Sequence, residues 1–362
     1  MSTAGPSQGA KALSGGRELH AVSERGGPVS APWIARQTEA LLAQRGHAWL
    51  LQGPSGLGQY ELALALVSAW LCEQPTAQGA CGHCPSCHAI EVRTHADLAV
   101  LMPETQMLQL GWPLSEKAQA DIDDKKRKPS KEIRVEAMRD LVEFAQRTDA
   151  RGRGKAVLVY PAERMNAVTA NALLKTLEEP PGDVRFVLAS EAAHQLLPTI
   201  RSRCQTHTLG WPSGDEALDW LRAQGLEAEP AQALLRSAGG RPDEVLRQTG
   251  AGLSPAWWVE LPRAMQRGDA AHLAELSPAQ AIDALQKLCH DLVLQHSGAA
   301  PRFFMASQLP ACQAPLAVLT DWFKRLMQAA CTAEHPFNAG LMLEALANDA
   351  QQALLARAPR QG

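Results

Sequence analysis

The feature that most constrains this chain is a glycine-rich turn between a short apolar run and a helical run. The apolar run covers 49–52, the turn carries Gly53, Gly56 and Gly58, and the helical run covers 61–72. This order predicts a strand, a tight turn and a helix, in which backbone N–H groups and the helix N-terminus face one point and can bind an anion. The turn therefore predicts a phosphate-binding loop in an α/β domain.

The two residues after the last glycine do not suit hydrolysis of a nucleoside triphosphate. A loop of that kind continues with Lys and then Ser or Thr, and this chain has Gln59 and Tyr60 there. Glutamine offers no charge to the β- and γ-phosphates, and tyrosine has no short hydroxyl for Mg²⁺. We therefore expect no ATP hydrolysis and weak or no nucleotide binding. Gly53, Gly56 and Gly58 remain candidate anion-binding residues, and the alternative is a turn kept for packing alone.

Composition limits the class of protein further. The 362 residues are enough for two or three domains, and 46% hydrophobic with 20% charged residues is ordinary for globular chains. A net charge of −3 argues against a chain that binds nucleic acid along its whole surface. No run reaches the roughly 18 apolar residues of a membrane span. Residues 1–27 are rich in Gly, Ser and Ala and are expected to form a disordered tail without a signal peptide, so we expect a cytoplasmic protein.

Short apolar runs alternate with helical segments as far as residue 210. Strands are expected at 49–52, 98–102, 155–160, 184–189 and 205–209. Runs without polar alternation are typical of strands that are covered on both faces, so the pattern predicts a parallel five-stranded sheet. The polar segment 103–131 is expected to be an insertion or mobile loop, with a basic contact to DNA as the alternative.

Beyond Trp211 the strand-like runs stop, and helices rich in Ala and Leu replace them. We expect an α/β domain over 28–210, a small helical domain over 211–250 and a helical bundle domain over 251–362. Leu- and Ala-rich stripes at helical spacing predict a core in this bundle, and such a bundle can also serve to associate with other subunits.

Four cysteines lie within sixteen residues at the end of the helix that follows the glycine loop. They are Cys72, Cys81, Cys84 and Cys87. Two successive Cys-x-x-Cys steps can direct thiolates to one ion, and four sulfur ligands leave no position for water or substrate. The spacing therefore predicts a structural Zn²⁺ site that folds a small module over 72–87. The alternatives are an iron–sulfur cluster, a site in which His83 or His88 replaces one cysteine, and four unligated thiols.

Three segments resemble the bacterial clamp-loader branch of the AAA+ family. They are Asn-Ala-Leu-Leu-Lys-Thr-Leu-Glu-Glu-Pro-Pro at 171–181, Ile-Arg-Ser-Arg-Cys at 200–204, and 335–346. The first two together are highly specific, and the resemblance extends from about Pro32 to about Leu346. It implies an AAA+ fold: a RecA-like domain that carries the zinc module, a helical lid and an all-α collar that assembles subunits.

The resemblance also implies a role for one arginine. In the family, the arginine of the Ser-Arg-Cys motif reaches the ATP of a neighbouring subunit, and that position is Arg203 here. A guanidinium suits this role because its fork of donors neutralises charge that spreads over the γ-phosphoryl oxygens. The alternative is that Arg201 and Arg203 are surface charges.

Other positions that an AAA+ ATPase requires are also changed. The family's acidic metal-binding pair falls on Tyr160 and Pro161, with Glu163 nearby but out of register. The lid arginine that contacts nucleotide falls on Asp243, unless a two-residue slip restores Arg241. Neither tyrosine nor proline can hold Mg²⁺ or polarise water, so these losses agree with the loss of the loop lysine.

These features imply a subunit without ATPase activity in a hetero-oligomer whose other members bind ATP. The resemblance implies tau/gamma ATPase subunits, a delta subunit, the sliding clamp and primer–template DNA as partners. An active ATPase motor of the tau/gamma type is one rival, and Gln59 and Tyr60 argue against it. A zinc-dependent DNA-binding module is the other, and the acidic net charge argues against that.

Overall fold

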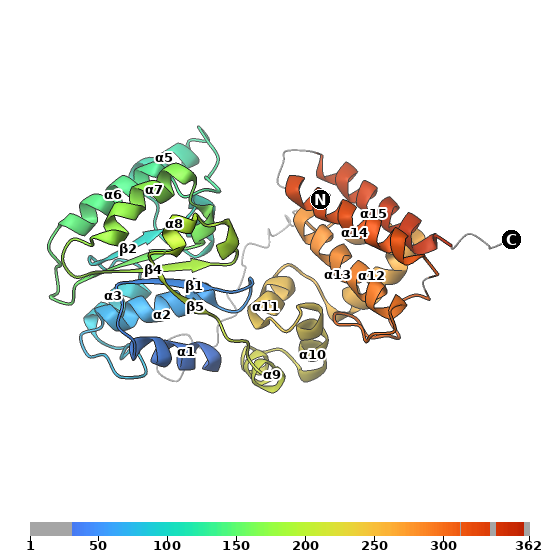
Figure 1. Ribbon diagram of the computed structural model, residues 1–362, viewed down its shortest axis with the longest axis horizontal. Helices are drawn as coiled ribbons and strands as arrows, with labels where there is room; N and C mark the ends of the chain where they lie inside the picture. Colours follow the sequence, from blue (N-terminus) through green and yellow to red (C-terminus); the bar gives the residue numbers. More distant parts are fainter. Residues whose placement is uncertain (1–30, 312, 334–337, 358–362) are drawn as a thin grey trace, which may run out of the picture.

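The structure is a computed structural model that describes residues 31–311, 313–333 and 338–357. The tail expected at 1–27 lies outside the described residues, as do 335–337 of the C-terminal resembling segment. Figure 1 shows an α/β body, a group of short helices beside it, and a bundle of longer helices at the other end.

A five-stranded parallel sheet forms the centre of the α/β body, as predicted (Figure 1). Its order is β2-β3-β4-β1-β5. The strands are β1 (Ala48–Gln52), β2 (Leu98–Leu101), β3 (Lys155–Val159), β4 (Val184–Ser190) and β5 (Gln205–Thr208). Leu51 of β1 is in register with Ala189 of β4 and His207 of β5, so the glycine loop leaves the sheet between two neighbouring strands.

Helices cover both faces of the sheet (Figure 1). Leu51 of β1 belongs to one apolar cluster with Trp33 and Leu62, and Leu50 belongs to the opposite cluster with Leu173. Because both faces of the pleat meet apolar side chains, the strands lack polar alternation, which is the pattern that the sequence carries. One face is covered by α1 (Pro32–Leu42), α2 (Gln59–Leu71) and α3 (Pro85–Glu91), and the other by α6 (Val135–Gln146), α7 (Ala167–Glu178) and α8 (Pro198–Arg201).

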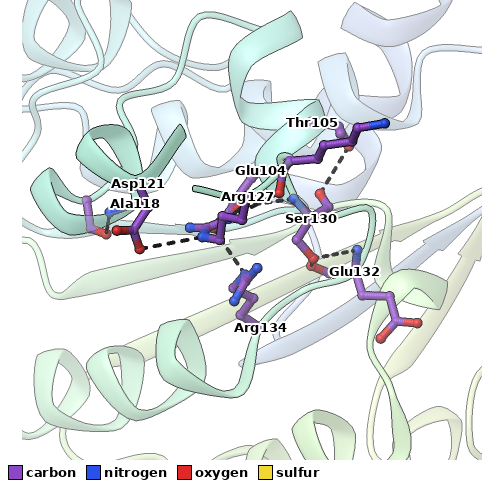
Figure 2. A network of polar contacts seen from close by, with 10 residues as sticks. Glu104, Thr105, Ala118, Asp121, Arg127, Ser130, Glu132 and Arg134 are labelled. Atoms are coloured by element: carbon purple, nitrogen blue, oxygen red, sulfur yellow. Dashed lines mark hydrogen bonds and ion pairs between the residues drawn. The ribbon is translucent and has the colours of Figure 1, made fainter. Parts of the chain in front are cut away.

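The polar segment after β2, expected to be an insertion or mobile loop, is a folded insertion. It contains α4 (Glu104–Gln109) and α5 (Glu116–Asp123), and α5 buries no residue. Figure 2 shows what holds it: Glu104 accepts hydrogen bonds from Arg127 at 2.5 and 2.8 Å and from the Ser130 N–H at 2.8 Å. Burial opposes ionisation of Glu104, but these donors lower its pKa below the ordinary value. A buried carboxylate therefore organises this insertion.

The second half of the chain is helical. A lid group contains α9 (Gly214–Ala223), α10 (Ala228–Ser237) and α11 (Pro242–Gly250). A collar group contains α12 (Pro255–Arg267), α13 (Pro278–His296), α14 (Leu316–Thr332) and α15 (Ala339–Leu355). One apolar cluster continues through both groups, from Leu221 in α9 to Leu354 in α15. No described helix is both long enough and apolar enough to cross a membrane.

A buried carboxylate joins the collar to the lid. Asp291 of α13 is fully buried and accepts hydrogen bonds from the backbone N–H groups of Arg302, Phe303 and Phe304 at 3.0, 2.7 and 2.8 Å. The Phe303 ring lies 3.0 Å from the point where a side chain at Gly239, just after α10, would begin. Asp291 therefore fixes one of the segments through which the collar touches the lid.

Candidate functional site

The glycine loop has the backbone of an anion-binding turn. Gly56 and Gly58 have φ of +86° and +93°, a region that residues with a side chain rarely adopt. Gly58 directly precedes α2, so the helix N-terminus opens onto the loop. The Gly53 N–H donates to the Ser190 carbonyl at 3.3 Å and ties the loop to the end of β4. The loop shape predicted from the sequence is present.

Gln59 fills the position where a phosphate-binding lysine would stand. Its side chain is 2% exposed, and Nε2 donates to the carbonyl oxygens of Gly53 and Pro54, both at 2.7 Å. The amide is thus turned back into the loop and supplies no positive charge to an anion. It also satisfies two carbonyl groups, which gives the loop a closed hydrogen-bond arrangement of its own.

Tyr60 belongs to a group of aromatic side chains. Its phenol oxygen accepts a hydrogen bond from Trp112 Nε1 at 2.8 Å, and its ring lies 5.4 Å from the ring of Tyr160. The Tyr160 hydroxyl donates to Glu191 Oε1 at 3.0 Å. Burial raises the pKa of Tyr60, and burial together with Glu191 raises the pKa of Tyr160. Both phenols therefore stay neutral at physiological pH and offer no anionic ligand to Mg²⁺.

Glu163 is the carboxylate nearest along the sequence to the position of the missing acidic pair, Tyr160 and Pro161. Its two oxygens accept hydrogen bonds from the Ser190 hydroxyl at 2.7 Å and from the Glu191 N–H at 3.2 Å. Glu163 and Glu191 both line a cavity of about 470 Å³ beside the loop. Glu163 lies in the short helical turn Ala162–Arg164 that follows β3. From there its carboxylate binds the end of β4 through Ser190 and Glu191.

The lid is attached to the loop by two arginines, Arg241 directly before α11 and Arg247 within it. Arg241 Nη1 donates to the Ser55 carbonyl at 3.0 Å, and Arg247 Nη2 donates to the Ser55 hydroxyl at 2.8 Å. The Glu244 backbone N lies 3.1 Å from the point where a side chain at Gly56 would begin, so the lid reaches the loop itself. The two residues that could occupy the position of the lid arginine, Asp243 and Arg241, therefore both lie beside the loop. Arg241 donates to a carbonyl oxygen there.

Asp243 places a carboxylate beside the loop. Its Oδ2 lies 3.4 Å from the point where a side chain at Gly58 would begin. Burial raises its pKa well above the ordinary value, and the nearby Glu61 and Glu191 carboxylates act in the same direction. The cavity thus gathers acidic side chains where a polyphosphate would need positive ones. Lys131, Arg164 and Arg247 are the basic residues among its lining.

The four predicted cysteines converge. Their sulfur atoms all lie within 4.8 Å of one another, and four of the separations are 3.8, 3.9, 3.5 and 3.7 Å. Four sulfurs at about 2.3 Å from a tetrahedral Zn²⁺ would be about 3.8 Å apart, so the spacing fits this ion. The cluster could therefore hold a metal ion such as zinc.

Local structure explains why the cysteines meet. Cys72 ends α2, Cys84 precedes α3, and a turn closed by Thr76 and Gly79 connects the two arms. Backbone N–H groups point at the sulfurs, with that of Cys81 3.3 Å from Cys72 Sγ. Burial opposes ionisation of Cys84, but hydrogen bonds from the backbone and from neighbouring cysteines lower its pKa to about 6, whereas burial raises the pKa of Cys72 and of Cys87.

Neither histidine alternative joins the cluster among the described residues. His83 Nδ1 lies 2.9 Å from the Cys81 carbonyl oxygen, and His88 lies 3.7 Å from Glu91. Arg151 Nη1 donates to Glu73 at 2.8 Å and links the module to the segment before β3.

Arg203 lies in the turn between α8 and β5. Its Nε donates to Glu178 Oε1 at 2.5 Å, Nη2 is paired with the same oxygen, and Nη1 donates to the Thr199 carbonyl at 2.9 Å. The side chain is 33% exposed. Arg201, two residues earlier, is exposed. The structure therefore distinguishes an oriented arginine from a solvent-facing one within the same motif.

Several contacts of the site were not foreseen from the sequence. Trp112 is 52 residues from the Tyr60 that it contacts, and Arg247 is 192 residues from Ser55. No local pattern signals contacts at such separations. Glu178 lies inside the quoted segment 171–181, but its pairing with Arg203 is visible only in three dimensions.

The parallel sheet, the glycine loop after β1 and the lid helices packed on that loop define a P-loop protein of the AAA+ type. A family model described as "DNA polymerase III, delta subunit" matches residues 35–211. DNA polymerase III subunit delta' of Yersinia pestis is 31% identical over 301 residues, which are 78% of this chain and 82% of that one. The chain therefore belongs to the family of DNA polymerase III delta' subunits.

Other relatives match over shorter regions. The delta' subunit of Pseudomonas aeruginosa is 41% identical over 214 residues, so this chain spans 58% of that relative's length. DNA polymerase III subunit tau of Escherichia coli is 34% identical over 158 residues, which are 44% of this chain and 20% of tau. This chain is thus similar in sequence both to delta' subunits and to a tau subunit.

Proposed function

We propose that this chain is a non-hydrolysing subunit of the replicative clamp loader. It acts in the ATP-dependent loading of the sliding clamp onto primed DNA. The observation that carries the proposal is the state of Gln59: an uncharged side chain, turned into the loop, stands where the cation for the phosphates is needed. Membership of the delta' family supports the assembly in which the chain would work.

The surroundings of the loop support the loss of nucleotide hydrolysis. Glu191 and Glu163 bring carboxylates to the cavity, and an anionic triphosphate would meet them without the loop lysine. The Tyr60 phenol accepts a hydrogen bond from Trp112, and its raised pKa keeps it neutral, so it offers no anionic ligand to Mg²⁺. Binding of a small anion to the backbone N–H groups of the loop remains compatible with this proposal.

The chain would influence chemistry through its neighbours. In this proposal the collar helices dock into a ring of related subunits, and Arg203 reaches the ATP of an adjacent tau/gamma subunit. A guanidinium placed there stabilises the charge of the transferring γ-phosphoryl group. The delta subunit, the sliding clamp and primer–template DNA are the further partners proposed for the assembly.

The metal would have a structural role. Cys72, Cys81, Cys84 and Cys87 would hold Zn²⁺ as four thiolates, and the ion would fix the module after α2. Four sulfur ligands leave no open position, so these residues would take no part in ATP turnover.

Two measurements test the proposal. Titration of the isolated chain with a fluorescent Mg·ATP analogue is expected to give no binding in the micromolar range. Micromolar binding with turnover would favour the rival, an active ATPase motor. In the reconstituted clamp loader, Arg203→Ala should lower the DNA-stimulated ATPase rate about tenfold or more. The matched control, Arg201→Ala, should leave it unchanged, and an equal effect of both variants would refute the role of Arg203.

A further inference from the structure

Arg203 is held from two sides by its own chain. Glu178 engages Nε and Nη2, and the Thr199 carbonyl accepts from Nη1 at 2.9 Å. These contacts restrict a long side chain that would otherwise sample many rotamers. A third of the side chain is exposed, so the guanidinium can still meet a ligand from outside.

Glu178 stands at a position that disfavours a carboxylate. It is the last residue of α7, where the exposed carbonyl groups of the helix carry partial negative charge. The positive charge of Arg203, on the facing turn, offsets the repulsion between the Glu178 carboxylate and these carbonyl groups. The Glu178 side chain is 46% exposed, and ion pairs that are open to solvent contribute little to stability. The main effect of the contact is therefore on the direction of Arg203 and not on the stability of the fold.

We propose that Glu178 is a positioning residue for Arg203, an inference that rests on the trans-acting role proposed for that arginine. A guanidinium that is already oriented loses less freedom when it meets the γ-phosphoryl oxygens of a neighbour's ATP. Glu178 engages Nε and Nη2 through one oxygen, so the second N–H of Nη2 is not used by this pair and can donate to the phosphate. The acid thus acts on the neighbour's reaction through Arg203 without touching the nucleotide.

The test is steady-state ATPase kinetics of the reconstituted clamp loader with primed DNA. Glu178→Ala is expected to lower kcat about 3- to 10-fold, which corresponds to the ordering of one long side chain. The KM for ATP should not change, because the arginine acts on charge that develops in the transition state. Glu178→Gln keeps an acceptor oxygen for Nε and should recover part of the rate. Glu179→Ala, which removes the adjacent exposed carboxylate, is the matched control and should leave both constants unchanged.

The double variant separates positioning from a structural effect. If Glu178 acts through Arg203, then Glu178→Ala adds no further loss in an Arg203→Ala background. A further loss there, or an unchanged or higher kcat for Glu178→Ala alone, overturns the positioning role. An unchanged rate for Arg203→Ala alone overturns the proposed function instead, so the two failures are distinguishable.

Discussion

Asp291→Ala tests how the collar is joined to the lid. The carboxylate is fully buried and accepts three backbone N–H groups at 2.7–3.0 Å, from Arg302, Phe303 and Phe304. A buried donor that is left without an acceptor costs roughly 1–3 kcal/mol. The substitution leaves three backbone donors without this acceptor, and two of the three bonds are only partly buried, so we expect a loss near the lower end of the summed range, about 4 kcal/mol, in the stability of this junction.

Hydrogen exchange of the three amides is the direct assay, because a chain of several bodies does not unfold in one step. A loss of about 4 kcal/mol corresponds to exchange roughly 10³-fold faster at Arg302, Phe303 and Phe304. Asp321→Ala is the control, since that carboxylate is 62% exposed and pairs with Lys324 on the surface of α14. Exchange in Asp291→Ala no faster than in the control would refute the reasoning.

Two further predictions concern the metal and the acidic cavity. A chelator should remove one Zn²⁺ per chain and make four additional thiols reactive toward a thiol reagent, because Cys72, Cys81, Cys84 and Cys87 lose their shared ligand. Iron with visible absorbance, or no metal at all, would contradict this. Asp243→Asn should stabilise the fold at pH 7 by an amount that shrinks as the pH falls toward 3.8. The raised native pKa means that the folded state binds this proton more tightly than the unfolded state, so stability falls as pH rises between the two values. Urea unfolding at several pH values measures this, with Asp219→Asn as the exposed control, and a difference independent of pH would contradict it.

The sheet was predictable because its signal is local. β3 is buried along its whole length, and an apolar run covered on both faces is visible in the sequence itself. The cysteine cluster was predictable for a related reason, since its ligands lie within sixteen residues and their spacing is set by short turns. Both predictions needed only neighbouring residues.

The insertion after β2 was not predictable in the same way. α5 has no buried residue, and the segment depends on ion pairs of Glu104 with Arg127 and Arg134, which are 23 and 30 residues away along the chain. Hydrophobic periodicity carries no trace of such an anchor, so the sequence resembled a loop. The lid contacts at Ser55 and the pairing of Glu178 with Arg203 were missed because they depend on tertiary packing.

The continuous apolar cluster through α9–α15 has a mechanical consequence. Because one apolar cluster packs the lid helices against the collar helices, we expect the two groups to move as one unit. This helical unit contacts the α/β body at Ser55 through Arg241 and Arg247. It also contacts α1, where the rings of Trp33 and Trp220 lie 5.2 Å apart. We therefore expect a displacement of the far end of the bundle to be transmitted to the glycine loop and to α1, and not to be absorbed by bending between the lid and the collar.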